Sequence, residues 1–85
     1  MESINLKDIL SYIVENLVEN PADISIETVE KEDTITLQLK VAESDMGKVI
    51  GRQGRIAKEI RAILKAAGLK EHKKVLVDKI GRAHV

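Results

Sequence analysis

The spacing of the apolar residues changes twice along this chain, and these changes restrict the fold more than any other feature of the sequence. Over residues 6–18 the apolar side chains recur at three- and four-residue intervals, which is typical of one face of a helix. Over residues 24–41 they alternate with polar ones, as in strands with one wet face. Helical spacing returns over 44–67, and residues 73–80 form a last short strand-like run.

Residues that interrupt regular structure set the expected ends of the first three elements. Asn20-Pro21 is expected to end the first helix, because proline disfavours the helical conformation in the residue before it. Residues 24–28 and 34–41 are predicted strands, and the polar segment 29–33 is the predicted turn between them. Together these two strands form a hairpin.

The second half of the chain is predicted to hold two helices and a strand. Ser44 or Asp45 is expected to cap a short helix that ends at Ile50, and Gly68 is the expected C-cap of a longer helix over 55–67. The predicted fold is therefore α+β in the order α-β-β-α-α-β. Two helices would cover one face of a three-stranded sheet, with the first helix against the same layer.

Composition limits what such a domain can be. A chain of 85 residues has room for one core, and the absence of Cys excludes disulfides and thiolate metal sites. No apolar run approaches the roughly 20 residues that span a bilayer, and no signal peptide is visible, so a cytoplasmic protein without membrane contact is expected. Phe and Trp are absent and Tyr12 is the single aromatic residue, which excludes nucleic-acid binding by rows of stacking rings.

The net charge of zero conceals a strong asymmetry. Residues 1–46 hold eleven acidic and three basic residues, a net charge of −8, whereas residues 47–85 hold eleven basic and three acidic residues, a net charge of +8. Such a division indicates one surface suited to a polyanion and another kept away from it. The alternative is that the two ends of a small domain simply lie on opposite sides.

The segment that carries the chemistry is a turn with two glycines, Gly51 and Gly54, between the two later helices. Glycine accepts positive φ and lets a foreign backbone approach closely. The helix that begins just after the turn exposes unpaired N–H groups, which suit phosphate oxygens. Arg52 and Arg55 add full positive charge beside these donors, and Gln53 can hydrogen-bond a sugar or phosphate.

Two familiar glycine motifs do not fit this segment. A dinucleotide-binding fingerprint needs a glycine two residues before Gly51, where this chain has Val49. A phosphate-binding P-loop that began at Gly47 would need Gly-Lys-Ser/Thr where the chain has Arg52-Gln53-Gly54.

The helix after the turn separates its apolar and basic residues onto neighbouring faces. At about 100° per residue, four apolar side chains cluster within a third of the circumference and four basic ones within the next third. A basic stripe of this kind is usually a solvated face, but directly after a glycine turn it becomes the side wall of a phosphate track. The apolar residues are Ile56, Ile60, Ile63 and Leu64, and the basic residues are Arg55, Lys58, Arg61 and Lys65.

Residues 49–60, Val-Ile-Gly-Arg-Gln-Gly-Arg-Ile-Ala-Lys-Glu-Ile, resemble the signature of the KH domain, V-I-G-x-x-G-x-x-I-x-x-I. The chain departs from it at Ala57, where many members carry a larger apolar residue, and Ile56 lies one position earlier. The element order is that of the type II KH fold, and the likeness covers residues 1–85 as a single KH domain. The chain thus resembles the small stand-alone bacterial KH proteins of the KhpA type.

The resemblance implies that the chain binds RNA and is not an enzyme. KH domains clamp about four nucleotides of a single strand by the backbone while the bases lie on an aliphatic groove. One such clamp binds weakly, so a second module is expected, as a homodimer or as a heterodimer with a larger KH-containing RNA-binding protein, in post-transcriptional regulation. Transferred to this chain, the phosphates would be held by Gly51, Arg52, Gln53 and Gly54, flanked by Lys48, Arg55 and Lys58, with Val49 and Ile50 in the apolar floor.

Other candidate sites have little support. His72 and His84 have no Cys or carboxylates at ligand spacing, and no Ser or acid pair has a catalytic arrangement, so no metal, cofactor or catalytic residue is expected. The basic run of Lys70, His72, Lys73 and Lys74 either extends the RNA surface or protects an edge strand from aggregation. The alternative function is that of a dimerisation subunit with a secondary RNA contact, because small domains often gain stability by association.

Overall fold

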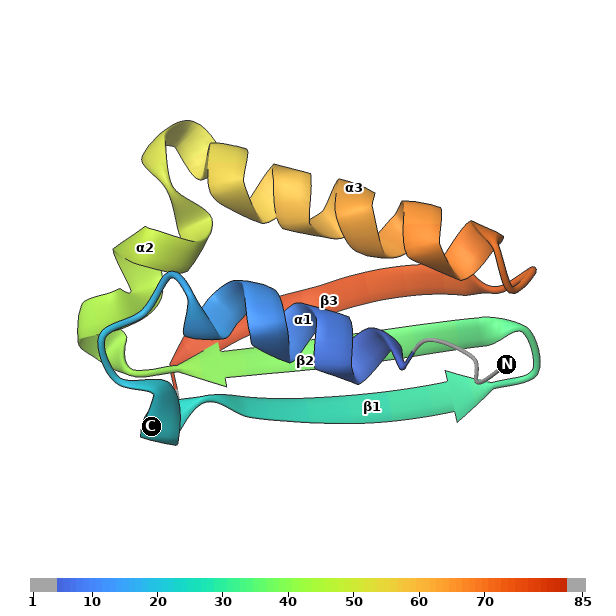
Figure 1. Cartoon of the computed structure of the whole chain (residues 1–85), viewed down its shortest axis with the longest axis horizontal. Coiled ribbons are helices and arrows are strands. Elements are labelled where there is room, and N and C mark those ends of the chain that lie inside the picture. The colour runs from blue at the N-terminus through green and yellow to red at the C-terminus, as the bar shows by residue number, and fades with distance from the viewer. Residues whose placement is uncertain (1–4, 83–85) are drawn as a thin grey trace.

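Three strands form one sheet, and the helices all lie against the same face of it (Figure 1). The computed structural model describes residues 5–82. The order α-β-β-α-α-β and the single covered face confirm the fold predicted from the sequence. The helices are α1 (Leu6–Glu15), α2 (Met46–Ile50) and α3 (Arg55–Leu69), the strands are β1 (Ser25–Lys31), β2 (Thr34–Val41) and β3 (Lys74–Arg82), and single 3-10 turns occur at Pro21–Asp23, Glu43–Asp45 and Arg52–Gly54.

The sheet is mixed, with β2 in the middle. β1 pairs with β2 in antiparallel orientation, as a hairpin requires, whereas β3 pairs with β2 in parallel. Parallel neighbours need a long crossover connection, and here α2, the glycine turn and α3 supply it. β3 is therefore an edge strand that lies beside α3, and its pairing with β2 shifts register between Leu37 and Gln38.

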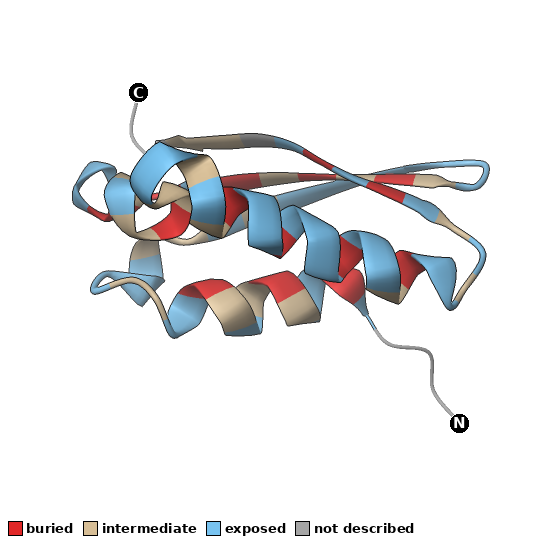
Figure 2. Ribbon diagram, turned by 90° about the horizontal axis from the view of Figure 1, so that it is seen from above, coloured by how far each residue is buried: buried red, intermediate tan, exposed pale blue. Residues whose placement is uncertain are grey.

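The core is built from aliphatic residues between the sheet and the helices. The alternation in β2 places every second side chain toward the helices, so its inward residues are buried and its outward ones are partly or fully exposed (Figure 2). α1 contributes one residue per turn to this core. α3, which lies on the same face of the sheet, does so as well. The cluster comprises Leu6, Leu10, Val14, Ile35, Leu37, Leu39, Val41, Val49, Ile60, Leu64, Val75 and Val77.

The first helix ends earlier than the sequence predicts. Its last residue is Glu15, because the side-chain amide of Asn16 donates to the carbonyl of Tyr12 at 2.7 Å, the acceptor that the backbone N–H of Asn16 would use in a continuing helix. The backbone N–H of Asn16 bonds to Ile13 instead. Leu17, which follows, still packs against the core although it lies outside the helix.

The hairpin turn is tighter than the predicted segment 29–33. β1 continues to Lys31, which pairs with Thr34, so only Glu32 and Asp33 form the turn. A two-residue turn requires positive φ, and Glu32 supplies it at 49°. Because the turn contains no glycine or asparagine, the polar segment 29–33 does not show which two of its residues form the turn.

Gly68 does not cap α3, contrary to the prediction. It lies inside the helix and is buried, and a Cβ at this position would stand 2.2 Å from Cγ2 of Val75. The helix continues to Leu69, and the left-handed residue in the following turn is His72, with φ of 59°. Gly68 therefore allows α3 to approach β3 closely.

Asp45 also differs from its predicted role as a helix cap. Its side chain makes no cap hydrogen bond, and its fully buried carboxylate accepts hydrogen bonds from the backbone N–H groups of Glu19 at 3.1 Å and Asn20 at 3.0 Å. The side-chain amide of Asn20 and the ammonium of Lys48 also donate to it. Burial raises the pKa of the Asp45 carboxyl, but these hydrogen bonds outweigh burial and hold the pKa below its ordinary value of 3.8.

The helices of residues 5–82 are too short or too polar to cross a lipid bilayer.

Candidate nucleic-acid interface

The turn between α2 and α3 is built on left-handed backbone. Gly51 and Gly54 have φ of 76° and 75°, and Gln53 between them has φ of 58°. The N–H of Gly51 donates to the carbonyl of Gly47 at 2.9 Å, and the N–H of Gly54 donates to the carbonyl of Gly51 at 3.2 Å. The turn is thus a hydrogen-bonded structure that requires glycine at two of its positions.

The two glycines have different surroundings. A Cβ on Gly51 would lie 2.6 Å from Cγ1 of Ile56, so this glycine is needed both for its φ and for its lack of volume. A Cβ on Gly54 would meet no atom within 4 Å, so the space above Gly54 is open. A foreign backbone can therefore approach the turn at Gly54.

The start of α3 is suited to an anion. Gly54 occupies the N-cap position and offers no side-chain acceptor, so the first N–H groups of the helix receive no capping hydrogen bond from it. The first turn contains no acidic residue, and Arg55 and Lys58 lie within it. The partial positive charge of the helix end and two full charges therefore act together.

The predicted basic residues fall into two groups in space. The side chains of Arg52, Arg55 and Lys58 are exposed and form no ion pair with any of residues 5–82. Lys48, in contrast, lies 3.5 Å from carboxylate oxygens of both Glu19 and Asp45. The structure thus brings three of the four predicted cations together around the turn and ties the fourth to the segment after α1.

The predicted apolar floor also divides. Val49 is fully buried in the core, so its side chain can support a floor only from beneath. Ile50 is half-buried and packs against the core, and it is the one of the two that keeps some accessible surface.

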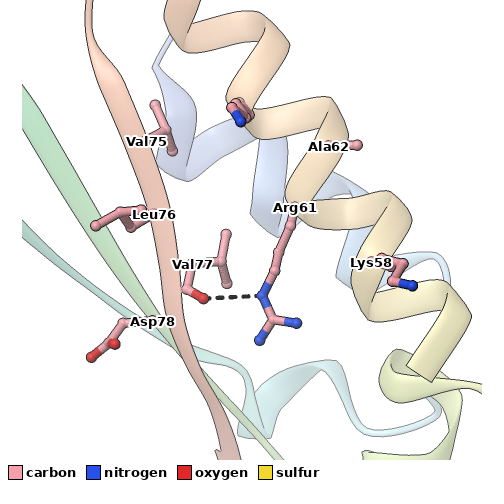
Figure 3. Close-up of a pocket in the computed structure, with 8 residues that line it drawn as sticks. Lys58, Arg61, Ala62, Val75, Leu76, Val77 and Asp78 are labelled. Atoms are coloured by element: carbon pink, nitrogen blue, oxygen red, sulfur yellow. Dashed lines mark hydrogen bonds between the residues drawn. The ribbon is translucent and has the colours of Figure 1, made fainter. Parts of the chain in front are cut away.

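A groove of about 550 Å³ runs between α3 and β3 (Figure 3). From α3 it is lined by basic residues that the sequence placed on one stripe, and Arg61 reaches across it, where its Nε donates to the carbonyl of Val77 at 3.1 Å. The groove lies beside β3, which is an edge strand of the sheet formed by residues 5–82. Its lining residues are Lys58, Arg61, Ala62, Lys65, Val75, Leu76, Val77 and Asp78.

The basic stripe in the sequence predicts the helical wall of this groove, but no local pattern predicts the wall formed by β3. The position of β3 depends on its pairing with β2, which lies more than thirty residues away in sequence. The one available signal was the α-α connection between two strands, since such a connection favours parallel pairing.

The histidines do not contribute a metal site within the described chain. His72 lies in the turn after α3, and no group of three metal-ligating side chains occurs among residues 5–82. His84 lies outside the described residues.

A glycine turn between two helices that cross over a sheet of order β1-β2-β3, covered on one face, defines a KH domain of type II. Residues 7–78 match the family described as KhpA/KhpB, KH domain. The chain belongs to this family of KH proteins, which is not a family of enzymes.

Several relatives bear the name RNA-binding protein KhpA. The protein of this name from Clostridium perfringens is 51% identical over 73 residues, which cover 86% of this chain and 97% of the relative. That from Bacillus subtilis is 48% identical over 71 residues, or 84% of this chain and 88% of the relative. That from Chlamydia trachomatis is 38% identical over 73 residues, or 86% and 94%.

Proposed function

We propose that this protein binds single-stranded RNA through the glycine turn at residues 51–54 and the groove between α3 and β3. The observation that carries the proposal is the start of α3, where a helix without a side-chain cap follows two left-handed glycines. Three exposed cations that form no ion pair within the described part of the chain surround this start: Arg52, Arg55 and Lys58. Because relatives are named RNA-binding proteins, RNA is the polyanion that we expect at such a site.

The mechanism is a backbone clamp with an aliphatic reading surface. Phosphates approach the open side of Gly54 and receive hydrogen bonds from the first N–H groups of α3, while Arg52 and Arg55 neutralise their charge. The bases then turn toward the groove, where Ala62 offers exposed apolar surface. A surface without aromatic rings stacks bases weakly, so affinity depends mainly on phosphate contacts.

Fluorescence anisotropy with a labelled random-sequence RNA tests this proposal. The Arg52→Asp/Gln53→Asp variant should lose binding, because it places two acids where phosphates approach. Aspartate tolerates the left-handed conformation of residue 53, so the variant should fold, which circular dichroism checks. A matched control, Lys7→Asp/Ser25→Asp, makes the same charge change at two exposed positions on α1 and β1 and should bind as the parent protein does.

Salt dependence supplies a second criterion. Each phosphate contact on a single strand contributes about 0.7 to the slope of log affinity against log salt concentration, so three or four contacts give a slope of about −2 to −3. An affinity that stays constant between 50 mM and 200 mM salt would contradict the proposal.

We also propose that the protein acts with a second RNA-binding module, as a homodimer or beside a larger KH-containing protein, in post-transcriptional regulation. A single clamp of about four nucleotides binds weakly, and linking two clamps raises affinity through effective concentration. Two large apolar side chains on the helical layer favour a protein contact: Tyr12 on α1 is 70% exposed and Ile63 on α3 is 49% exposed.

The alternative is a dimerisation subunit in which RNA contact is secondary. Sedimentation analysis of the Ile63→Ser and Arg52→Asp/Gln53→Asp variants separates the two functions. If RNA binding depends on the turn and association depends on Ile63, both functions are present on separate surfaces. If association is intact and the parent protein does not bind RNA, the alternative is correct.

A further inference from the structure

The groove between α3 and β3, which is part of the RNA site proposed above, adjoins another cleft. A second cleft of about 360 Å³ lies at the C-terminal end of α3, and it shares Lys65 and Val75 with the first. The two clefts therefore adjoin along the same helix and the same edge strand. We call the second one the distal cleft; it is lined by Lys65, Leu69, His72, Lys73, Lys74 and Val75.

The distal cleft combines an apolar base with a basic rim. Leu69, which is 65% exposed, supplies the accessible apolar surface, whereas Val75 belongs to the core and is 6% exposed. The lining includes no acidic residue, and neither Lys65 nor Lys74 forms an ion pair with any residue in the range 5–82. This is the chemistry of the first groove repeated: cations for phosphates beside aliphatic surface for bases.

Lys73 is the exception in this rim. Its ammonium is hydrogen-bonded to the carboxylate of Glu30 on β1, and this bond and the charge of Glu30 raise the pKa of Lys73. Lys73 is thus held on the β1 side of the turn. The cations that remain available to a ligand in the distal cleft are Lys65 and Lys74.

The spacing of cations along α3 connects the two clefts. Lys58, Arg61 and Lys65 follow one another at three and four residues, so they form one row along the helix edge that faces β3. From Arg55 to Leu69 the helix rises about 21 Å at 1.5 Å per residue. A single strand that begins at the glycine turn must therefore follow most of this length before it reaches the distal cleft.

We propose that the distal cleft is a second contact site for the same RNA strand, which extends the footprint beyond the roughly four nucleotides of one clamp. Lys74 binds an additional phosphate, Lys65 stands where the two clefts meet, and Leu69 contacts a base. This inference rests on the proposed RNA binding at the glycine turn and deepens it, because it specifies the length of strand that the protein holds.

The test compares random-sequence labelled RNA of four and of eight nucleotides. The variant is Lys74→Gln, which removes one charge from the distal cleft and none from the turn or from the first groove. The matched control is Lys40→Gln, which removes one charge from an exposed position on β2. The Arg52→Asp/Gln53→Asp variant reports on the turn in the same experiment.

The parent protein should bind the eight-nucleotide RNA more than tenfold tighter than the four-nucleotide RNA. Sliding of a four-nucleotide site along eight nucleotides gives at most about fivefold, because only five registers exist. The Lys74→Gln variant should lose about threefold in affinity for the longer RNA, with its salt slope reduced by about 0.7, and should bind the shorter RNA unchanged. The control variant should match the parent protein on both lengths.

Two results would overturn the inference while the proposed function stands. One is a gain of fivefold or less from the longer RNA; the other is a Lys74→Gln variant that binds the longer RNA as the parent protein does or loses affinity equally on both lengths. If instead the Arg52→Asp/Gln53→Asp variant binds both lengths as the parent protein does, the proposed clamp itself is wrong. If the parent protein binds neither length, both proposals are overturned.

Discussion

The two ends of α3 use glycine for opposite reasons. At the N-terminal end, Gly51 and Gly54 adopt φ of 76° and 75° and form an accessible turn. At the C-terminal end, Gly68 lies in regular helix, fully covered by β3, and the left-handed residue in the turn is His72. The first end needs the backbone freedom of glycine at both positions and its small volume at Gly51, whereas the second end needs only the small volume.

This difference separates function from stability along one helix. A side chain added at the first end meets open space or a movable neighbour, so the main consequence is for what can approach the turn. A side chain added at the second end meets the edge strand, so the main consequence is for the packing of α3 on the sheet. Four substitutions test the comparison.

The largest effect is expected for Gly68→Ala. The new Cβ would stand 2.2 Å from Cγ2 of Val75 and 3.0 Å from the carbonyl oxygen of Lys73, so α3 and β3 must move apart. Overpacking of this kind costs about 3 kcal/mol, reduced by up to about 1 kcal/mol because alanine favours the helix. Urea denaturation measures the loss. Since Val75→Ala removes the clashing methyl, the double variant should be more stable than the sum of the single effects predicts.

Gly51→Ala is expected to cost about 2 kcal/mol, from positive φ and from contact with Ile56. Ile56 is half-buried and its side chain can shift, so the clash costs less than that at Gly68. RNA affinity should fall with it, because the turn is displaced. Retention of full RNA affinity in a destabilised Gly51→Ala protein would show that the geometry of the turn does not matter for binding.

Gly54→Ala is expected to cost about 1 kcal/mol, since only the positive φ opposes it. Its effect on RNA binding should be larger than its effect on stability, because the Cβ occupies the open side where the phosphates approach. Parallel titration and denaturation of Gly54→Ala and Gly68→Ala check this inversion. A Gly68→Ala protein that is folded at the assay temperature should still bind a four-nucleotide RNA.

The smallest effect is expected for His72→Gly, a gain of about 0.5 kcal/mol. Glycine removes the strain of φ at 59°, partly offset by the greater entropy of the unfolded chain. His72→Ala serves as the control and should give no gain, because alanine keeps the strain. A gain from both would place the effect in the side chain of His72 rather than in its backbone.

Local patterns predicted the parts of the molecule that local interactions determine. The alternation over residues 34–41 predicts the observed bounds of β2. This works because the polarity needed at each position depends only on whether that face of the strand is covered. The glycine turn was likewise predicted from contiguous residues, and the structure places Gly51, Arg52, Gln53 and Gly54 where α2 meets α3.

The predictions failed where a partner distant in sequence decides the outcome. Gly68 looked like a helix cap, and only the presence of Val75 across the turn shows that it is a packing residue. The sequence also predicts Asp45 as a cap, but its carboxylate accepts hydrogen bonds from the backbone N–H groups of Glu19 and Asn20. The helical spacing predicts that Ile63 lies on the apolar face of its helix. In the structure it lies at the boundary of that face and is half exposed.

The buried carboxylate of Asp45 makes one joint of the fold sensitive to acid. It connects the end of the α1 segment to the helix that precedes the glycine turn, across twenty-five residues. Because the pKa of Asp45 is lower in the folded protein than its ordinary value of 3.8, the stability it contributes is complete above that pH and declines as the pH falls below it. The amide protons of Glu19 and Asn20 should then exchange with solvent before those of β2, so that the first part of the chain to open is the one that steadies α2.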